Sequence, residues 1–374
     1  MTGNMPTVVV AMSGGVDSSV AAALLVEQGY TVIGMMMRLW SEETAPDLTG
    51  HNRCCTPEQM NDARRVADML DIPFYVLDTR DVFRNKIVQF FIDQHADGLT
   101  PNPCLACNMH IRFDWLLNNA LALGADYLAT GHYARITQSA EGLFELRKGH
   151  SLEKDQSYVL SVMTQEQLRH TLFPVGDYIK PQVRELAAKF GLPVASKHDS
   201  QDLCFLGDGD YRRFLREHGP VDLFMSGPIL NRRGEQVGTH DGLPNYTIGQ
   251  RKGLGISGSG DPLYVIDLDR QRNAVIVGTR DELGRDRLVA GRVNWIAGAP
   301  PSGAIRAEVK IRYKAKPAPA MLEALPDGRV KVIFDESLRD ITPGQGAVFY
   351  DGDRCLGGGL IQRVEHLESA AISS

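Results

Sequence analysis

Apolar and polar residues at the start of the chain follow a pattern that predicts a strand, a loop, a helix and a second strand. Apolar runs at 7–12 and 31–37 have the composition of buried parallel strands. Between them, residues 19–28 have a helical pattern, and Gly29 follows as a typical residue after a helix cap. A unit of this kind is typical of a sheet whose neighbouring strands are parallel.

The alternation of helix-like and strand-like segments continues through the first half of the chain. Thr56 and Gln59 have the spacing of a capping box around a proline at the first helical position. A strand at 74–77, a helix at 113–123 and a strand at 127–130 follow. This order predicts an α/β fold with a doubly wound parallel sheet, covered on both faces, whose ligands bind at the carboxyl ends of the strands.

From about residue 208 the pattern changes. Residues 208–283 are rich in glycine and turn pairs, and they predict a small, separate central domain. From residue 284 onward the alternation is that of an all-β region, and it is clearest at 305–313. We therefore expect three domains, 1–207, 208–283 and 284–374, the last of them a small C-terminal antiparallel β-barrel.

Composition places the chain among ordinary globular proteins, since 43% of its 374 residues are hydrophobic and 23% are charged. No apolar run approaches the ~20 residues of a membrane span, and residues 1–10 lack the basic and apolar regions of a signal peptide. Six cysteines without a secretion signal favour reactive thiols, metal ligands or buried thiols over a disulfide framework. We expect a cytoplasmic protein with no membrane partner.

The formal net charge of −6 gives the chain no general attraction to nucleic acid. Binding of RNA would therefore depend on local basic patches. One candidate lies in the segment 306–316, and a second is scattered over Arg212, Arg213, Arg232, Arg233, Arg251 and Lys252. Each group could equally be a solvated charged face.

Residues 13–18, Ser-Gly-Gly-Val-Asp-Ser, follow the first predicted strand directly and lead into the first helix. Two adjacent glycines let the backbone approach an anion, and the helix N-terminus offers unpaired N–H groups and the positive end of its dipole. The hydroxyls of Ser13, Ser18 and Ser19 add further donors. We interpret this segment, the phosphate loop, as a binding site for phosphate groups; the alternative is a glycine-rich turn without a ligand.

Asp17 distinguishes the phosphate loop from other nucleotide motifs. The loop lacks the lysine of a Walker A sequence, and a carboxylate beside phosphates is tolerable only with a metal ion or backbone N–H groups. Both kinds of partner remain open for Asp17 at this point. A second segment, 253–258, fits Gly-x-Gly-x-x-Gly but lacks the flanking strand and helix of a dinucleotide site, so we assign it no nucleotide.

Cys104 and Cys107 follow two prolines and precede the helix predicted at 113–123, in a segment that we expect to be a loop. A nearby helix N-terminus lowers the pKa of a thiol, which makes Cys107 a candidate nucleophile. Cys204 follows a second polar segment. The alternatives are a zinc site, disfavoured because no second Cys-x-x-Cys or His pair is present, and buried inert thiols, which we expect for Cys355. Two further cysteines receive no role: Cys54 and Cys55.

The phosphate loop and the two cysteine segments resemble those of the bacterial tRNA-specific 2-thiouridylases, which thiolate the wobble uridine of certain tRNA anticodons. The resemblance covers nearly the whole chain. It implies ATP contacts at Ala11, Met12, Ser13, Gly14, Gly15, Val16, Asp17, Ser18, Met37 and Gly131. It implies that Cys107 is the nucleophile and that Cys204, in the motif at 199–205, carries a persulfide. It implies contacts to the target base from Asn102, Pro103 and Cys104, and contacts to tRNA from His132, Lys154, Asp155, Gln156, Arg312, Tyr313 and Gln345.

The chemistry implied by the resemblance begins with ATP and magnesium. The C2 oxygen of uracil is a poor leaving group, so ATP converts it to an adenylate and pyrophosphate departs from the phosphate loop. A persulfide on Cys204 supplies sulfur, AMP leaves, and Cys107 resolves the persulfide, which produces a Cys107–Cys204 disulfide. The expected partners are tRNA and a persulfide sulfur-carrier protein or cysteine desulfurase.

Position 104 departs from the commonest family pattern, because Cys104 stands where an aspartate is usual. An acid–base role for that aspartate cannot be transferred. Together with Cys107 and Cys204, this thiol could complete an iron–sulfur site; the alternative is a spectator thiol or a second resolving cysteine. Two rival functions remain open: another pyrophosphate-loop ATP enzyme, such as a tRNA lysidine synthetase or an amide-forming synthetase, and an ATP-gated RNA-binding protein without turnover.

Overall fold

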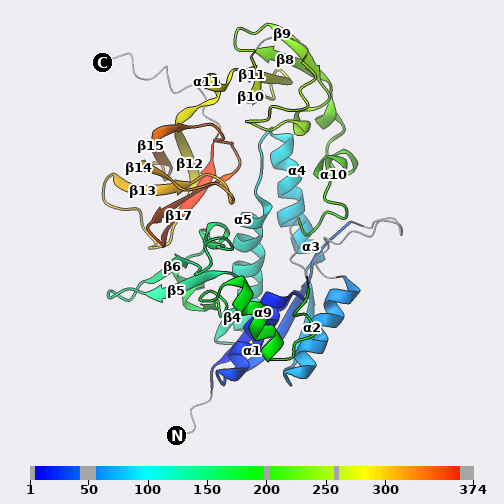
Figure 1. Cartoon of the computed structure of the whole chain (residues 1–374), viewed down its shortest axis with the longest axis vertical. Helices are drawn as coiled ribbons and strands as arrows, with labels where there is room; N and C mark the ends of the chain where they lie inside the picture. The colour runs from blue at the N-terminus through cyan, green and yellow to red at the C-terminus, as the bar shows by residue number, and fades with distance from the viewer. Residues whose placement is uncertain (1–4, 43–55, 198–202, 257–260, 363–374) are drawn as a thin grey trace.

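The computed structural model describes residues 5–42, 56–197, 203–256 and 261–362. Within these ranges the chain forms a parallel sheet flanked by helices, a smaller sheet at the top of Figure 1, and a yellow-to-red barrel at its side. The predicted fold class is confirmed. No helix in the described ranges combines the length and the apolar character needed to cross a bilayer.

The parallel sheet has the strand order β3-β2-β1-β4-β7. Its strands are β1 (Thr7–Ala11), β2 (Thr31–Arg38), β3 (Phe74–Asp78), β4 (Tyr127–Ala129) and β7 (Thr171–Leu172). The order reverses at the neighbouring pair β1 and β4, and ligands of such sheets bind at this switch point. The phosphate loop follows β1, and Gly131 follows β4.

Helices cover both faces of the sheet, which explains why its strands are apolar runs. Val8 and Val10 are buried on one face, which is covered by α1 (Val16–Glu27), α2 (Pro57–Met69) and α9 (Lys180–Lys189). Val9 is buried on the other face, which is covered by the π-helical segment η2 (Asn108–Leu116), α6 (Leu117–Ala122), α7 (Ser157–Leu160) and α8 (Gln165–Arg169).

Helix α1 begins at Val16 rather than at the predicted residue 19, because the extended Gly15 is its N-cap. Gly29, with φ +87°, follows the cap at the other end, as predicted. At the start of α2 the Thr56 hydroxyl accepts the Gln59 amide at 3.2 Å, and the Gln59 side chain accepts the Thr56 amide at 3.3 Å. The predicted capping box is confirmed.

The segment that carries Cys104 and Cys107 is helical, so the predicted loop is wrong. Helix α5 (Pro103–Cys107) continues directly into η2 and α6. Asn102 is the N-cap, and its Oδ1 accepts the amides of Cys104 at 3.1 Å and Leu105 at 3.3 Å. An asparagine cap followed by proline starts the helix well before residue 113. A second helical run packs against it: α3 (Arg80–Phe83), η1 (Arg84–Val88) and α4 (Gln89–Ala96).

The central part is built on an open sheet of strand order β10-β11-β8-β9. Its elements are α10 (Tyr211–His218), η3 (Val221–Phe224), β8 (Gly227–Asn231), β9 (Gln236–His240), η4 (Leu243–Asn245), β10 (Tyr264–Asp269), β11 (Ala274–Gly278) and α11 (Arg280–Leu283). Residues 253–256 lie outside helices and strands, which agrees with the absence of a dinucleotide fingerprint; residues 257–258 lie outside the described ranges.

The barrel has the strand order β12-β15-β14-β13-β16-β17 and closes through a pairing of β12 with β17. Its strands are β12 (Arg285–Trp295), β13 (Ile305–Lys310), β14 (Ala318–Ala324), β15 (Val330–Leu338), β16 (Gly346–Asp351) and β17 (Arg354–Ile361). The strand predicted to continue to residue 313 ends at Lys310. Arg312 and Tyr313 lie in the following turn, in which the Ala315 amide donates to the Arg312 carbonyl at 3.0 Å.

A hairpin from the first half of the chain extends the barrel sheet. Its strands are β5 (Ala134–Gln138) and β6 (Phe144–Lys148). Strand β6 pairs antiparallel with β17, and in this register Leu146 lies opposite Cys355. Arg135 and Arg147 donate to the two carboxylate oxygens of Asp353 at 2.9 and 2.7 Å. The barrel is therefore joined to the parallel-sheet part by a continuous hydrogen-bonded sheet.

Candidate functional site

The phosphate loop is closed by its own hydroxyl groups. The Ser18 hydroxyl accepts the Ser13 amide at 3.2 Å and donates to the Gly15 carbonyl at 3.3 Å, and the Ser19 hydroxyl donates to the same carbonyl at 2.8 Å. Ser19 is fully buried, so its role is to hold the loop rather than to face a ligand. Ser13 is exposed, as expected for a donor to a phosphate.

Glycines in and around the loop serve different purposes. A Cβ at Gly14 would lie 2.2 Å from the Gln59 carbonyl oxygen, and a Cβ at Gly131 would lie 2.6 Å from the Ser18 nitrogen. These two glycines are required by close packing of the protein on itself. A Cβ at Gly15 would meet only the Ser13 Oγ, at an ordinary 3.4 Å. The protein thus leaves open space beside Gly15, at the N-terminus of α1, which fits a phosphate group.

Asp17 is neutralised by a lysine from far along the chain. The Lys180 ammonium lies 2.7 Å from Oδ1 and 2.9 Å from Oδ2 of Asp17, and the Tyr133 hydroxyl donates to Oδ1 at 2.7 Å. Lys180 begins α9, and its side chain is only 12% exposed. Sequence reasoning admitted a metal ion or backbone amides as partners of Asp17, and the structure provides an ammonium group and a phenol.

A second lysine reaches the other side of the phosphate loop. The Lys197 ammonium donates to the Gly14 carbonyl at 3.0 Å and to the Asp62 carboxylate of α2 at 2.7 Å. Two ammonium groups therefore border a loop that has no lysine of its own. Positive charge beside an anion cradle favours a polyphosphate ligand.

The residues around the phosphate loop fit the phosphates of ATP. They also fit magnesium, provided that the Lys180 ammonium moves away from Asp17. An open glycine, an exposed serine, a helix N-terminus and two lysines form a suitable phosphate cradle. Asp17 has carboxylate oxygens of the type that magnesium prefers. Both oxygens now accept Lys180, so an ion at Asp17 requires the ammonium to shift toward the phosphates.

Cys107 and Cys204 belong to one apolar cluster. Cys107 is 7% exposed and is a buried member of the cluster, and the half-buried Cys204 packs against the same cluster. The remaining buried members are Leu39, Phe83, Ile87, Val88, Phe91, Ile92, Ala106, Ile111, Phe205, Leu206, Phe214 and Leu215. Two thiols that are far apart in sequence therefore share one environment. Residues 199–202 of the Cys204 motif lie outside the described ranges, as do Cys54 and Cys55.

The segment that follows Cys204 is held by a buried carboxylate. Glu42 is 6% exposed; it accepts the Gly207 amide at 3.1 Å and both guanidinium nitrogens of Arg213, at 2.9 and 2.6 Å. Burial alone would raise the pKa of Glu42, but the Arg213 and Gly207 hydrogen bonds hold it below its ordinary value. Arg213 also donates to Asp208 at 2.7 Å, so it ties the Cys204 segment to α10. Because Arg213 is engaged in these ion pairs, we no longer count it in the scattered basic patch.

The cysteines do not form a single-ion site. Among the described residues, the group of His, Cys, Asp or Glu ligand atoms gathered within 4.8 Å is that of Glu42, Glu217 and His218, where Arg213 already serves as the cation. Apolar side chains, including Phe205, fill the surroundings of Cys107 and Cys204. Cys104 is not a member of this apolar cluster, and we derive no step through an iron–sulfur group.

The predicted tRNA residues near β4 are largely buried. His132 is 7% exposed, and its Nδ1 lies 2.6 Å from the Thr130 hydroxyl; burial, and then Arg112, hold its pKa well below the ordinary value. Asp155 is 5% exposed and accepts three hydrogen bonds, from the Gly149 amide and from the amide and hydroxyl of Ser157.

Gln156 supports the phosphate loop through Tyr133. Its side chain accepts the Tyr133 amide at 2.9 Å, and its own amide donates to the Tyr133 carbonyl at 2.9 Å. Tyr133 in turn holds Asp17. Lys154, from the same segment, is half-buried.

Barrel residues reach the start of α5. The Tyr313 ring lies 6.1 Å from that of Tyr158, edge to face, and Lys310 lies 5.9 and 5.5 Å above the rings of Tyr158 and Tyr313. Burial, and then Asp155 and Cys104, raise the pKa of Tyr313. Cys104 itself is exposed at the entrance to α5. Lys310 is a functional candidate that sequence reasoning did not single out.

The basic segment 306–316 is partly neutralised on the protein surface. Arg306 donates to both oxygens of Asp335 at 2.7 and 2.6 Å, and Arg312 forms an ion pair with Asp340. Exposed pairs of this kind are weak and exchange readily for phosphate partners. Cys355 is 1% exposed, which confirms that it is buried, and burial raises the pKa of its thiol to about 12.

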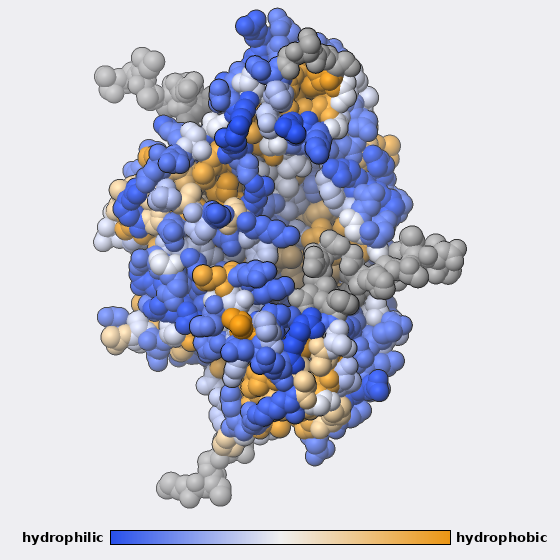
Figure 2. All heavy atoms as spheres, viewed as in Figure 1, coloured by the Kyte–Doolittle hydropathy of each residue, from blue (hydrophilic) through white to orange (hydrophobic). Residues whose placement is uncertain are grey.

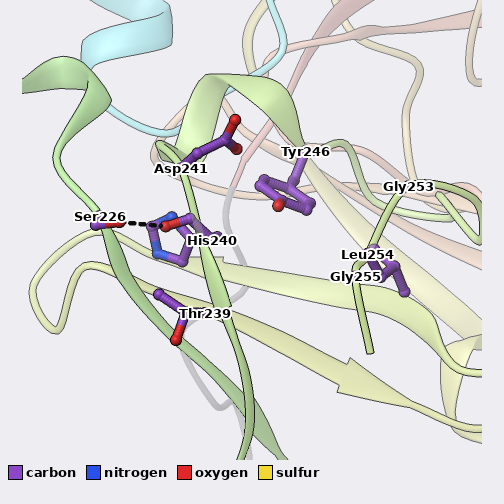
Figure 3. A pocket seen from close by; sticks show the side chains of 8 residues that line it. All are labelled: Ser226, Thr239, His240, Asp241, Tyr246, Gly253, Leu254 and Gly255. Atoms are coloured by element: carbon purple, nitrogen blue, oxygen red, sulfur yellow. Dashed lines mark hydrogen bonds between the residues drawn. The ribbon is translucent and has the colours of Figure 1, made fainter. Parts of the chain in front are cut away.

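Figure 2 shows that the face in view is hollowed between the parallel-sheet part, the barrel and the central sheet, and that hydrophilic residues dominate the rim. A separate pocket of about 260 Å³ lies wholly in the central part. Figure 3 shows its lining, in which Tyr246 and His240 lie opposite the segment of Gly253 and Leu254. None of the predicted site residues lines this pocket.

Comparison with known proteins decides the family. Residues 6–208 match the tRNA methyl transferase HUP domain, residues 212–279 the tRNA methyl transferase PRC-barrel domain, and residues 285–361 the aminomethyltransferase beta-barrel domain. The tRNA-specific 2-thiouridylase MnmA of Moorella thermoacetica is 51% identical over 96% of this chain and 100% of that protein. The proteins of the same name from Heliobacterium modesticaldum and Geotalea uraniireducens are 51% and 50% identical, over 96% and 97% of this chain and 92% and 96% of theirs.

This chain belongs to the tRNA-specific 2-thiouridylase family. The resemblance drawn from the sequence motifs is confirmed, and the chain is an ATP-binding enzyme of tRNA modification. In this thiouridylase the sequence motifs did not reveal Lys180 and Lys197, which act on the phosphate loop from about half the chain away. Lysines on helices or in loops carry no periodic signal, so only the folded chain could identify them.

Proposed function

We propose that this protein uses ATP to replace the C2 oxygen of the wobble uridine of tRNA with sulfur. The observation that carries the proposal is the shared cluster of Cys107 and Cys204, since no other described feature brings two thiols together across the sequence. Adenylation alone needs no such pair, and this argues against a lysidine synthetase or an amide-forming synthetase. A protein that only binds RNA would need neither the thiols nor the phosphate cradle.

In the proposed first step, ATP binds with its phosphates at residues 11–18, and Met37 and Gly131 border the nucleotide. Asp17 would hold magnesium, which supplies charge neutralisation for the departing pyrophosphate. Lys180 and Lys197 supply further positive charge where negative charge develops. The uracil C2 oxygen attacks the α-phosphorus, the bond to pyrophosphate breaks, and the adenylate forms.

In the proposed second step, Cys204 carries a persulfide received from a sulfur-carrier protein or a cysteine desulfurase. Its terminal sulfur attacks C2 of the adenylate and expels AMP, which leaves the base joined to Cys204 through an S–S bond. The Cys107 thiolate then attacks the Cys204 sulfur. That S–S bond breaks, its electron pair remains on the base sulfur as the 2-thio group, and a Cys107–Cys204 disulfide forms for later reduction.

The remaining site residues are assigned to recognition. Asn102, Pro103 and Cys104 lie at the start of α5, where Cys104 is exposed, and they would contact the target base. Contacts to tRNA would come directly from Lys154, Arg312, Tyr313 and Gln345. The buried His132 and Asp155 and the half-buried Gln156 would act by shaping the surface. We propose a cytoplasmic reaction and functional units at 1–207, 208–283 and 284–374.

The experiment is mass spectrometry of tRNA nucleosides after incubation of the protein with ATP, magnesium, unmodified tRNA and a persulfide donor. We expect 2-thiouridine at the wobble position, with one AMP and one pyrophosphate for each product. ATP turnover with a different modified nucleoside would replace the proposal with another ligase reaction. Absence of AMP and pyrophosphate under all conditions would leave a binding protein.

The iron–sulfur alternative is tested on anaerobically purified protein. We expect a colourless, iron-free protein that thiolates tRNA through the persulfide. A brown protein whose visible absorbance and activity both disappear in Cys104→Ser would overturn the persulfide route.

A further inference from the structure

The barrel and the start of α5 touch through two short segments. We call residues 99–103 the thiol loop, because it leads into the helix of Cys107, and residues 341–346 the barrel loop, because it leads into β16. The Thr100 amide donates to the Pro343 carbonyl at 3.0 Å. The Gln345 side-chain amide donates to the Thr100 carbonyl at 2.9 Å and to the Pro101 carbonyl at 3.3 Å.

The thiol loop depends on these partners because its own sequence provides few donors. Pro101 and Pro103 have no backbone N–H. Carbonyls next to prolines in a half-buried loop need hydrogen-bond donors from elsewhere, since an unsatisfied buried carbonyl is destabilising. The Nε2 of Gln345 carries two N–H donors, and it serves two consecutive carbonyls.

The approach of the two loops is too close for larger residues. A Cβ at Gly344, where φ is +91°, would lie 3.0 Å from the Thr100 nitrogen and from its oxygen. A Cβ at Gly346 would lie 2.8 Å from Leu105 Cδ1 and 2.9 Å from the Tyr158 hydroxyl. Glycines on both sides of Gln345 let the barrel loop lie directly on the thiol loop and on α5.

A second connection runs parallel to the first. The buried Tyr158 hydroxyl donates to the Gly346 carbonyl at 3.0 Å and is also hydrogen-bonded to the Asn102 side chain. Asn102 uses its Oδ1 to cap α5, so its amide nitrogen is the donor to Tyr158. The chain of contacts from Gly346 through Tyr158 to Asn102 ends at the first turn of the helix that carries Cys107.

We propose that Gln345 is a positioning residue of the thiol site: its amide fixes the thiol loop against the barrel and thereby sets the place of Cys104 and Cys107. The proposal rests on the function proposed above for Cys107, but it assigns to Gln345 a role within the protein in the absence of tRNA. The C-terminal barrel is then part of the catalytic apparatus and not only a surface that binds RNA.

Two variants of Gln345 test the proposal on the full-length protein without ATP or tRNA. Gln345→Ala removes both hydrogen bonds, and Gln345→Glu places carboxylate oxygens against two carbonyl oxygens. Gln271→Glu, on the exposed turn between β10 and β11, makes the same charge change far from the thiol loop. Tyr158→Phe, which keeps the buried ring, breaks the second connection.

The readouts are hydrogen exchange of peptides that span residues 100–107 and the rate of Cys107 alkylation by iodoacetamide. We expect exchange and alkylation to be about tenfold faster in both Gln345 variants and in Tyr158→Phe, as the loss of one or two hydrogen bonds predicts. Gln271→Glu should behave as the unmodified protein. Exchange elsewhere in the barrel should be unchanged in all variants.

Unchanged exchange and alkylation in both Gln345 variants, with only tRNA affinity reduced, would overturn the proposal and make Gln345 a simple tRNA contact. Faster exchange throughout the barrel would overturn it as well, because a general loss of barrel structure would then explain the effect. Since the readouts need neither ATP nor tRNA, they are decided independently of whether the protein thiolates uridine.

Discussion

The Lys180 ammonium bonds both carboxylate oxygens of Asp17, at 2.7 and 2.9 Å, across 163 positions of sequence. The acidic residue of the phosphate loop and its neutralising lysine thus form a unit. In the proposed reaction, magnesium would be a new ligand for Asp17, and the phosphates of ATP would be new ligands for Lys180. With this exchange of partners, the charges of Asp17 and Lys180 are each compensated both before and after ATP binds.

We expect Lys180→Ala and Asp17→Asn each to reduce pyrophosphate release in the presence of tRNA by about a hundredfold, as is typical when a group that stabilises developing charge is removed. Lys189→Ala is a matched control, because Lys189 lies on the same helix and forms an ion pair with the exposed Glu27, which is not part of the phosphate loop. Native pyrophosphate release from Lys180→Ala would show that the lysine only supports the fold.

Substitutions at the two loop glycines should separate binding from folding. Gly15→Val should retain its melting temperature and lose ATP affinity, because the open space beside Gly15 belongs to the ligand. Gly14→Ala should be destabilised by about 1–3 kcal/mol, since its φ of +70° and the Gln59 carbonyl oppose a Cβ. Calorimetric titration with ATP and thermal unfolding measure both effects. Native ATP affinity in Gly15→Val would move the nucleotide away from this loop.

Cysteine variants should divide the reaction into its steps. Cys204→Ser should form the adenylate but no thiolated nucleoside, and Cys107→Ser should fail to complete repeated turnovers. Cys355→Ser should be active, because that thiol is buried with a raised pKa. Mass spectrometry of the tRNA and of the protein persulfide measures each stage. Thiolation at the native rate by Cys204→Ser with a protein persulfide donor would contradict the assigned roles.

Arg312→Ala should weaken tRNA binding by about 1–3 kcal/mol if the arginine contacts a base edge, or reduce the salt dependence by about one unit if it contacts a phosphate. Asp340→Asn should strengthen tRNA binding, because it releases Arg312 from its ion pair. Filter binding at several salt concentrations distinguishes these outcomes. Identical binding curves for both variants and the unmodified protein would exclude this turn from the interface.

His95 should make the fold sensitive to acid. Burial, and then Arg212, lower the pKa of His95 from 6.5 to about 4, so the folded protein keeps it neutral while the unfolded chain takes up a proton. Stability is therefore lost as the pH falls below about 6.5 toward 4, by about 1.4 kcal/mol for each pH unit. His95→Phe should show a smaller loss between pH 7.5 and 5.5 in urea unfolding. An equal loss in both proteins would assign the acid sensitivity to other groups.

Local sequence signals predicted the phosphate loop, the capping box of α2 and the alternation of strands and helices in the parallel-sheet part, because each depends on neighbouring residues. The start of α5 was also readable, since Asn102 followed by proline is the same kind of signal as Thr56 followed by proline. The alternating pattern at 305–313 overstated β13 because Ile311 is buried within the turn that follows the strand.

Other features depend on partners that no local pattern identifies. Lys180 and Lys197 reach the phosphate loop only in the folded chain. The pairing of β6 with β17 joins segments separated by about two hundred residues, and a hairpin with one unpaired edge gives no indication of which strand will cover it. The clustering of Cys107 with Cys204 came from family resemblance and not from spacing.

The pairing of β6 with β17 also has a consequence for the order of events during synthesis. A ribosome releases the parallel-sheet part first, and domains generally fold as they emerge. The hairpin β5–β6 and the thiol loop obtain their hydrogen-bond partners only from the region of β16 and β17. These strands are among the last to leave the ribosome. A nascent or truncated chain without these strands can thus form its ATP cradle while its thiol loop still lacks the hydrogen bonds from Gln345.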